Sequence, residues 1–202
     1  MSEKERDGGS EKLAISSKLD RVSEIIPCKL FLSDMIAAKD VSVVNYLSIT
    51  HIVNASNGAA PSKLADITYH NVNIEDTEES DISRDFIETH DFITSALLRG
   101  GKVLVHCMVG VSRSSSIIMH HIMMTGRTLR EAVELVKTAR PVVNPNKAFA
   151  QSLLDAELSE RGENTIELGE ICKGGVEVFR RERDIKNMMD TFGKEEENCH
   201  IL

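Results

Sequence analysis

The feature that most restricts the fold is a short apolar run, Lys102 to His106, placed directly before a segment of helical character. The run reads Lys-Val-Leu-Val-His and follows the pair Gly100-Gly101. A strand this short and this apolar is typical of one buried on both faces, as in a parallel sheet. Parallel neighbours need long crossover connections, and the segments between the apolar runs are long enough to be helices. The sequence therefore predicts an α/β fold.

The remaining segments continue this alternation of strands and helices. The further predicted strands are 28–32, 51–56 and 68–74. The first is expected at a sheet edge, because Pro27 before it has no N–H to donate. The predicted helices are 81–98, 114–125, 128–136 and 146–158, with Asp81 as the cap of the first. We expect a central, mostly parallel twisted sheet of about five strands flanked by helices.

The chain divides into three parts by composition. Residues 1–22 are rich in charge, Gly and Ser and are predicted to be a flexible tail, and residues 23–160 form one domain. Residues 161–202 are predicted to be a linker followed by an amphipathic helix. Its apolar stripe is Ile185, Met188, Met189 and Phe192. Three interpretations stay open for that helix: it docks on the domain's own surface, it contacts a partner or a second copy, or it is unstructured.

Composition and charge exclude some classes of binding partner. The net charge of −8 argues against a nucleic acid, since there is no basic stripe to replace counterions on its phosphates. No apolar run approaches the ~20 residues of a membrane span. The N-terminus has no secretory signal, so we expect a cytoplasmic protein, with the nucleus as a second compartment, and four reduced cysteines.

The C-terminus, Cys199-His-Ile-Leu202, has the outline of a prenylation box. His occupies a position that is usually aliphatic, and the segment starting at Glu195 is acidic where a basic patch would assist membrane binding. We therefore do not expect prenylation.

The stretch from Val105 to Ser114 carries the chemistry. A buried strand ends at Cys107, a loop with Gly110 follows, and Arg113 opens a helix. A loop that enters a helix N-terminus points its N–H groups inward and adds the positive end of the helix dipole, which favours a phosphate. Arg113 supplies a planar fork for two phosphate oxygens.

The same electrostatic field is expected to activate the cysteine. Cysteines beside cations at helix N-termini have pKa values lowered to about 3.5–7.5, so Cys107 would be a thiolate nucleophile at neutral pH. Ser114 can donate a hydrogen bond to its sulfur and improve it as a leaving group. Taken alone, Cys107 would more simply be an inert buried thiol; the combination with Gly110, Arg113 and Ser114 favours the catalytic interpretation.

These residues also carry a family resemblance. His106-Cys107 through Arg113-Ser114 resembles the H-C-x(5)-R-S signature of protein tyrosine phosphatases, and Gly-Val-Ser-Arg-Ser resembles that of the dual-specificity branch. The similarity extends over about residues 24–158 and includes Leu30-Phe-Leu-Ser and the segment from Arg140 to Phe149. The chain is most similar to the small, atypical members of that branch.

The resemblance implies roles for three more residues. Asp76 lies about thirty positions before the cysteine, where the family carries its general acid. Glu75 and Asp81 are the competing candidates. Asn146 matches an asparagine that braces the phosphate loop, with a simple helix cap as the alternative, and His106 is expected to orient the loop through a buried hydrogen bond.

The implied activity is hydrolysis of phosphotyrosine, phosphoserine and phosphothreonine in proteins, through a cysteinyl-phosphate intermediate and without metal or cofactor. The predicted phosphate-binding loop is Met108, Val109, Gly110, Val111, Ser112 and Arg113. Lipid- and RNA-directed relatives carry basic residues at the positions of Met108, Val109 and Val111, which here are uncharged. The alternative from another class is a phospho-binding adaptor with feeble catalysis.

Overall fold

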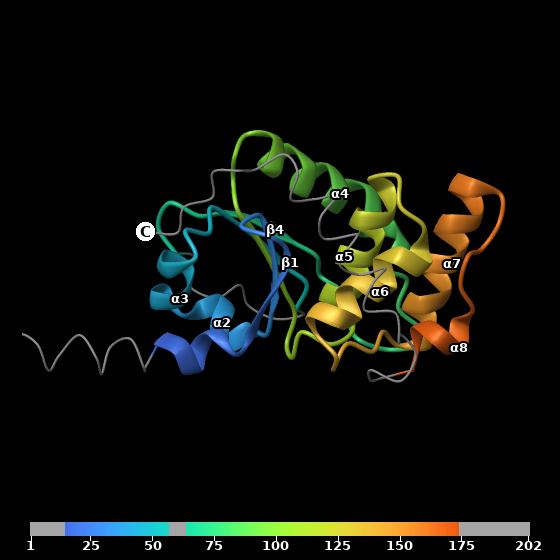
Figure 1. The fold of residues 1–202 in the computed structure, drawn as a ribbon, viewed down its shortest axis with the longest axis horizontal. Coiled ribbons are helices and arrows are strands. Elements are labelled where there is room, and N and C mark those ends of the chain that lie inside the picture. The colour runs from blue at the N-terminus through green and yellow to red at the C-terminus, as the bar shows by residue number, and fades with distance from the viewer. Residues whose placement is uncertain (1–14, 57–63, 174–202) are drawn as a thin grey trace, which may run out of the picture.

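A five-stranded sheet forms the centre of the computed structural model, which describes residues 15–56 and 64–173 (Figure 1). Its strands are β1 Val22–Ile26, β2 Leu30–Ser33, β3 His51–Asn54, β4 Thr68–Asn71 and β5 Val103–His106. They lie in the order β1-β2-β5-β3-β4. β1 pairs antiparallel with β2, and every other neighbouring pair is parallel. The predicted α/β class and mostly parallel sheet are confirmed.

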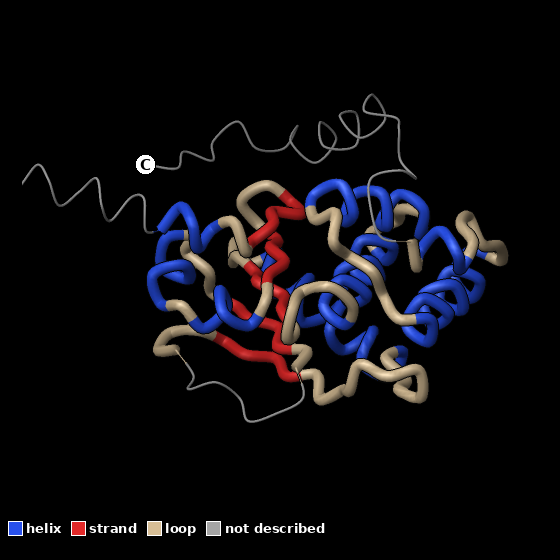
Figure 2. Tube along the Cα trace, turned by 90° about the horizontal axis from the view of Figure 1, so that it is seen from below, coloured by secondary structure: helices blue, strands red, loops and turns tan. Residues whose placement is uncertain are grey.

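Helices cover both faces of the sheet (Figures 1 and 2). They are α2 Met35–Lys39, α3 Val41–Tyr46, α4 Ser83–Leu98, α5 Arg113–Met124, α6 Leu129–Ala139, α7 Lys147–Arg161 and α8 Leu168–Ile171. The larger core lies between the sheet and α4 to α7, and a smaller one lies beside α2 and α3. The two cores bury both faces of the central strand, as its uniformly apolar sequence requires.

The central strand β5 sets the position of residues 107–112, which connect it to α5 and are called the signature loop below. Val103, Leu104 and Val105 are each 0% exposed, and β5 pairs with β2 on one side and β3 on the other. His106 at its end is in register with Ser33 of β2 and Asn54 of β3. The C-terminal ends of β2, β3 and β5 therefore lie side by side next to Cys107. Ligand sites of α/β sheets lie at this edge.

The strand expected at the sheet edge is not an edge strand. β1, which the sequence did not reveal, pairs with β2 and forms the edge itself. Cys28 and Pro27 lie in the turn between them, and Cys28 has a positive φ of 57°. The strand predicted at 68–74 is also shorter than expected. It ends at Asn71, although Val72 and Ile74 beyond it are buried.

Two short helices, α2 and α3, were not predicted because segments of five and six residues carry too little periodicity. Each is begun by an aspartate. Asp34 Oδ1 accepts a hydrogen bond from the Ala37 N–H at 2.9 Å, and Asp40 Oδ1 accepts one from the Ser42 N–H at 2.9 Å. These side chains satisfy the free donors of a helix start and so define the helices. α2 continues directly from β2 and lies beside the signature loop, since the Met35 N–H donates to the Met108 oxygen at 3.3 Å.

The first part of the predicted linker is folded onto the domain. Ile166 and Ile171 are 3% and 0% exposed and belong to the larger core. The Glu157 carboxylate of α7, itself 0% exposed, accepts hydrogen bonds from the N–H groups of Leu129 and Thr165 at 2.6 and 2.8 Å. A fork from Arg130 to Glu170, with both distances 3.0 Å, fastens α8 to α6. Residues 161–173 thus differ from the linker that the sequence predicts.

The predicted tail helix with its stripe from Ile185 to Phe192, and the sequence Cys199-His-Ile-Leu202, lie outside the described residues. Any contact of that helix with a partner or second copy is therefore untested. Within residues 15–56 and 64–173, the helices are too short or too polar to cross a membrane.

The packing of α8 predicts where the domain ends. A chain ending at residue 160 would expose the pocket of Ile166 and Ile171 and remove both Thr165 donors from buried Glu157. We expect its free energy of unfolding to be lower by at least about 3 kcal/mol than that of a chain ending at residue 173. Urea unfolding of the two truncations measures the difference. Equal stabilities would show that residues 161–173 contribute nothing to the fold.

Candidate active site

The signature loop connects β5 to α5 and places Cys107 at the bottom of a cradle of backbone N–H groups. Cys107 is 2% exposed, and α5 begins at Arg113. Gly110 has a φ of 72°, and a Cβ added there would lie 2.5 Å from the Ser33 oxygen. Only glycine fits such a conformation against such a close neighbour. The loop is therefore folded back tightly over the end of β2.

The Cys107 sulfur accepts hydrogen bonds from the Ser114 hydroxyl and from the Gly110 N–H, both at 3.2 Å. Burial opposes ionisation of the thiol. The hydrogen bonds from the Ser114 hydroxyl and the backbone N–H groups of Ser114, Val111 and Gly110 outweigh it, and the pKa of Cys107 is lowered. The predicted contact of Ser114 with the sulfur is present.

The outer side of the loop is held by Arg140, a residue to which the sequence assigned no role. Its Nε donates to the Gly110 oxygen at 2.8 Å and its Nη2 to the Val109 oxygen at 3.2 Å. Its Nη1 reaches the Arg21 oxygen at 3.2 Å, just before β1. By binding the carbonyl oxygens from outside, Arg140 supports the orientation in which the Gly110 N–H faces the sulfur. The only sequence signal for it was its place in the segment that resembles the family.

His106 lies behind the loop and is 0% exposed. Its Nδ1 is 3.2 Å from the Cys107 oxygen, which is the buried hydrogen bond expected of it. Burial lowers the pKa of His106 to about 4, so the ring is neutral at neutral pH and Nδ1–H is the donor. A neutral ring with no path to solvent is suited to orienting the loop and not to transferring protons.

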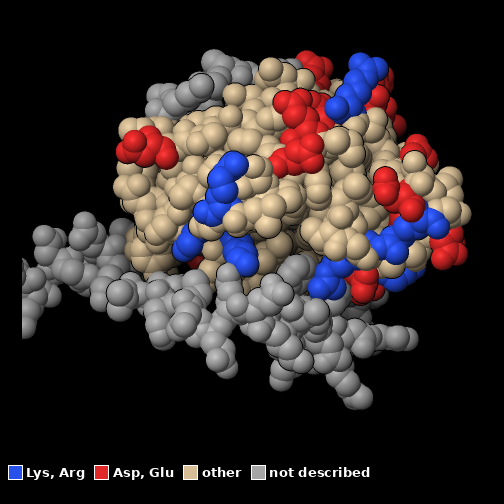
Figure 3. Space-filling model, turned by 90° about the horizontal axis from the view of Figure 1, so that it is seen from above, with Lys and Arg blue, Asp and Glu red and all other residues tan. Residues whose placement is uncertain are grey.

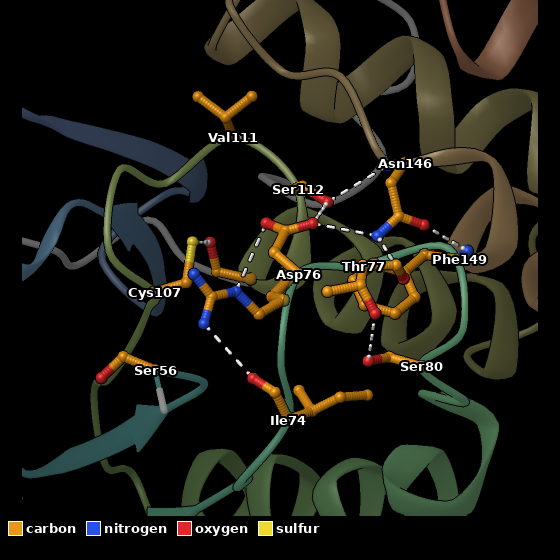
Figure 4. A network of polar contacts seen from close by, with 12 residues as sticks. Ser56, Ile74, Asp76, Thr77, Ser80, Cys107, Val111, Ser112, Asn146 and Phe149 are labelled. Atoms are coloured by element: carbon orange, nitrogen blue, oxygen red, sulfur yellow. Dashed lines mark hydrogen bonds and ion pairs between the residues drawn. The ribbon is translucent and has the colours of Figure 1, made fainter. Parts of the chain in front are cut away.

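Asp76 lies in the loop that follows β4, beside Ser112 and Asn146 (Figure 4). Its Oδ2 is 3.3 Å from Arg113 Nε, an ion pair whose N–H is not aligned as a hydrogen bond. Arg113 Nη1 also donates to the Ile74 oxygen at 3.3 Å. The competing candidate Asp81 instead binds the Ser83 N–H and Arg84 Nε, both at 3.0 Å, at the start of α4. Asp76 therefore lies beside Arg113, whereas Asp81 binds residues at the start of α4, where the N-cap is Ile82 and not Asp81 as the sequence predicts.

Ser112 and Asn146 join the loop of Asp76 to the cradle (Figure 4). The Ser112 hydroxyl donates to Asp76 Oδ1 at 2.7 Å and accepts from the Asn146 N–H at 3.1 Å. Asn146 Nδ2 donates to the same Oδ1 at 2.9 Å and to the Thr77 oxygen at 3.2 Å. Asn146 Oδ1 accepts from the Phe149 N–H at 2.9 Å, so the residue caps α7 as well as bracing the site. Asn146 thus makes the contacts that both interpretations require.

The rest of the predicted phosphate-binding loop forms its rim. Met108 and Val109 are 44% and 60% exposed, and Val111 points away from the polar network (Figure 4).

Cys28 lies in the turn before β2, whereas Cys107 follows β5, the strand that pairs parallel with β2. The two cysteines are therefore at opposite ends of the sheet, and Cys28 cannot form a disulfide with Cys107 in this fold. Within the described residues no group of three or more His, Cys, Asp or Glu side chains could hold a metal ion.

Comparison with known proteins matches this architecture to one family. Residues 30–159 match the model of the dual specificity phosphatase catalytic domain. Dual specificity protein phosphatase 1 of Arabidopsis thaliana is 37% identical over 149 residues, covering 73% of this chain and 75% of the relative. Dual specificity protein phosphatase 15 of Mus musculus is 35% identical over 169 residues, covering 83% and 70%.

This chain belongs to the dual specificity phosphatases. Among solved structures, the crystal structure of DUSP15 superposes with a TM-score of 0.65 at 36% identity, covering 70% of this chain and 90% of that one. A human tyrosine phosphatase-like serine/threonine/tyrosine-interacting protein gives a TM-score of 0.65 at 33% identity, covering 69% and 97%. The predicted family is confirmed, and with it a cysteine-dependent protein phosphatase acting on phosphotyrosine and phosphoserine/threonine.

The close approach of Gly110 to β2 gives this phosphatase a sensitive test of its cradle. Gly110→Ala would force a Cβ to within 2.5 Å of the Ser33 oxygen and turn the loop N–H groups away from the sulfur. We expect a loss of kcat/KM on an aryl phosphate of at least about 100-fold, as when an oxyanion donor is removed. Gly162→Ala is the matched control, because Gly162 has a φ of 79° with nothing within 4 Å of an added Cβ. Similar activity in both variants would contradict this account of the loop.

Proposed function

We propose that Cys107 is the nucleophile of this dual specificity phosphatase, that Asp76 is its general acid and base, and that Arg113 and the loop N–H groups hold the phosphate. One observation supports this most directly. The Cys107 sulfur accepts from Ser114 and Gly110 while Arg113 lies between that loop and Asp76. A thiolate nucleophile, an anion cradle and an acid are thus in one place, as cysteine-based phosphoryl transfer requires.

The first step transfers the phosphoryl group to the enzyme. The ester phosphate enters the loop, and its equatorial oxygens take hydrogen bonds from the loop N–H groups and the Arg113 fork. The Cys107 thiolate attacks phosphorus, an S–P bond forms, and the bond from phosphorus to the leaving oxygen breaks. Asp76 gives its proton to that oxygen, so the alcohol or phenol departs neutral and Asp76 becomes a carboxylate.

The second step releases phosphate. Asp76, now a carboxylate, takes a proton from water as the water oxygen attacks phosphorus, and the S–P bond breaks with its electron pair returning to sulfur. The Ser114 hydroxyl, 3.2 Å from the sulfur, favours this departure because it stabilises the thiolate that forms. Asp76 ends the cycle protonated and Cys107 ends it as a thiolate, so no metal, oxidant or reductant enters the balance.

Phosphorylated proteins are the substrates that the rim of the site favours. Only residues 75–82 separate the buried Ile74 from α4, so no long insertion walls the site and both long and short phosphorylated side chains can reach the sulfur. The exposed loop residues Met108 and Val109 are uncharged. On the face shown in Figure 3, basic and acidic side chains are interspersed without a continuous basic surface, unlike a nucleic-acid interface.

The nucleophile is tested with the variant Cys107→Ser. We expect wild-type protein, in chelator and reductant, to hydrolyse a fluorogenic aryl phosphate and to be blocked by vanadate. The serine variant should lose turnover by at least about 1,000-fold, since a hydroxyl in this site is not ionised at neutral pH. Phosphate-ligand affinity should remain, which shows that the variant is folded. Near-wild-type turnover by the variant would remove Cys107 from the role. Inactive but folded wild-type protein would favour the phospho-binding alternative.

The acid is tested by changing the leaving group. Asp76→Ala should lower kcat by about 100-fold for an alkyl phosphate such as phosphoserine, within the range for one general acid. The loss should be several-fold smaller for a nitrophenyl phosphate, whose leaving oxygen needs little protonation. Asp81→Ala is the matched control, because Asp81 serves the start of α4. Equal losses on both substrates would assign Asp76 a structural role.

A further inference from the structure

An apolar arc borders one side of the phosphate cradle. It consists of Ile36, Met108, Val109 and Val142, which are 61%, 44%, 60% and 59% exposed. Nine large hydrophobic side chains are exposed in the described part of the chain, and these are four of them. Exposed apolar side chains are ordinary when scattered singly, but a group of them beside a binding site indicates contact with a ligand or partner.

Hydrogen bonds to main-chain oxygens of the signature loop hold the three segments of the apolar arc next to one another. The Met35 N–H, one residue before Ile36, donates to the Met108 oxygen at 3.3 Å. Arg140, two residues before Val142, donates to the Val109 oxygen at 3.2 Å. The Asn144 N–H, two residues after Val142, donates to the Val111 oxygen at 3.0 Å. The apolar arc therefore runs from the start of α2, over the first half of the signature loop, to the segment before α7.

The other side of the cradle has the opposite character. Beyond Asn144 the same segment reaches Asn146, which binds Asp76 and Thr77. The loop of Asp76 continues with Glu78 and Glu79, both exposed. The cradle thus lies between an acidic rim and the apolar arc, and the two rims would contact different parts of a bound substrate.

The arc lies within reach of residues close to the phosphorylated one. Met108 and Val109 directly follow the nucleophile, and consecutive Cα atoms are about 3.8 Å apart, so both lie within about 8 Å of Cys107 along the chain. An extended peptide advances about 3.3 Å per residue. A substrate side chain one or two positions from the phosphorylated residue therefore reaches the arc once the phosphate is in the cradle.

We propose that the apolar arc binds an apolar side chain of the substrate protein, one or two positions from the phosphorylated residue. The proposal rests on the proposed function, since it needs the phosphate in the cradle. It names the substrate class more closely: phosphorylated segments with Leu, Ile, Met or an aromatic residue beside the phosphorylated position.

Two arginines beside the arc are already bound by protein groups, which makes them poor partners for the headgroup of a polyphosphorylated lipid. Such a headgroup carries further phosphates, which need cationic partners outside the cradle. The Arg140 guanidinium already binds the Val109 and Gly110 oxygens. Arg21, the other arginine beside the arc, is 2.5 Å from the Asp34 carboxylate. An apolar side chain needs no such partner and gains from leaving water.

The experiment compares phosphotyrosine peptides that differ only by Leu or Ser at one position from −2 to +2. Hydrolysis of an aryl phosphate, too small to reach the arc, is the reference for every protein. Wild type should show kcat/KM about 3- to 10-fold higher for Leu at one of the positions nearest the phosphotyrosine, as partial burial of such a side chain gives. The double variant Ile36→Ser/Val142→Ser should reduce that preference to below about 2-fold.

Ile87→Ser/Leu98→Ser is the matched control, because both residues are exposed on α4, and it should keep the wild-type preference. A wild type that hydrolyses the aryl phosphate without any preference for Leu would overturn the proposal and leave the proposed function standing. So would an unchanged preference for Leu in the Ile36→Ser/Val142→Ser variant. A wild type inactive on the aryl phosphate would contradict the proposed function itself.

Discussion

The hydrogen bonds that the Cys107 sulfur accepts from Ser114, Val111 and Gly110 are the interactions on which the rest of the site depends. A thiol that is 2% exposed would ordinarily be inert, because burial disfavours the thiolate. Here the donors outweigh burial and the pKa of Cys107 falls. The donors are in place because β5 ends at His106, directly before Cys107, and α5 begins at Arg113, so the loop between them turns its N–H groups toward the sulfur.

Separate elements hold that loop in shape from every side. β2 approaches Gly110 so closely that no side chain fits there, and Arg140, after α6, binds the loop oxygens from outside. On the substrate side, Ser112 and Asn146 anchor Oδ1 of Asp76, which leaves Oδ2 facing Arg113. A phosphate that takes the Arg113 fork would replace Asp76 as its ionic partner. The cradle therefore requires the whole domain, although its reactive atoms come from a few consecutive residues.

The sequence was sufficient to predict the elements and residues whose structure depends on their immediate neighbours in the chain. The apolar run 102–106, the glycine and the arginine identified β5, the loop and the start of α5. It was insufficient to predict the elements that form only through contacts with distant parts of the chain. β1 forms because it pairs with β2. Residues 161–173 fold because Thr165 donates to Glu157 and because Ile166 and Ile171 pack in the larger core. Ser112 and Arg140 act through contacts with residues distant in sequence, 36 positions away for the bond from Ser112 to Asp76. No local sequence pattern predicts such contacts.

Catalysis by the proposed mechanism requires the Cys107 sulfur to be a thiolate, whereas binding a phosphate does not. The measurement that tests this most directly is the rate of Cys107 alkylation by iodoacetamide as a function of pH, followed by peptide mass analysis. A lowered pKa predicts that the rate rises to its plateau below the pH expected of an ordinary thiol, about 8.5. Ser114→Ala should move the midpoint upward, because it removes a donor that favours the charged form. A wild-type midpoint at or above the ordinary value would contradict the account.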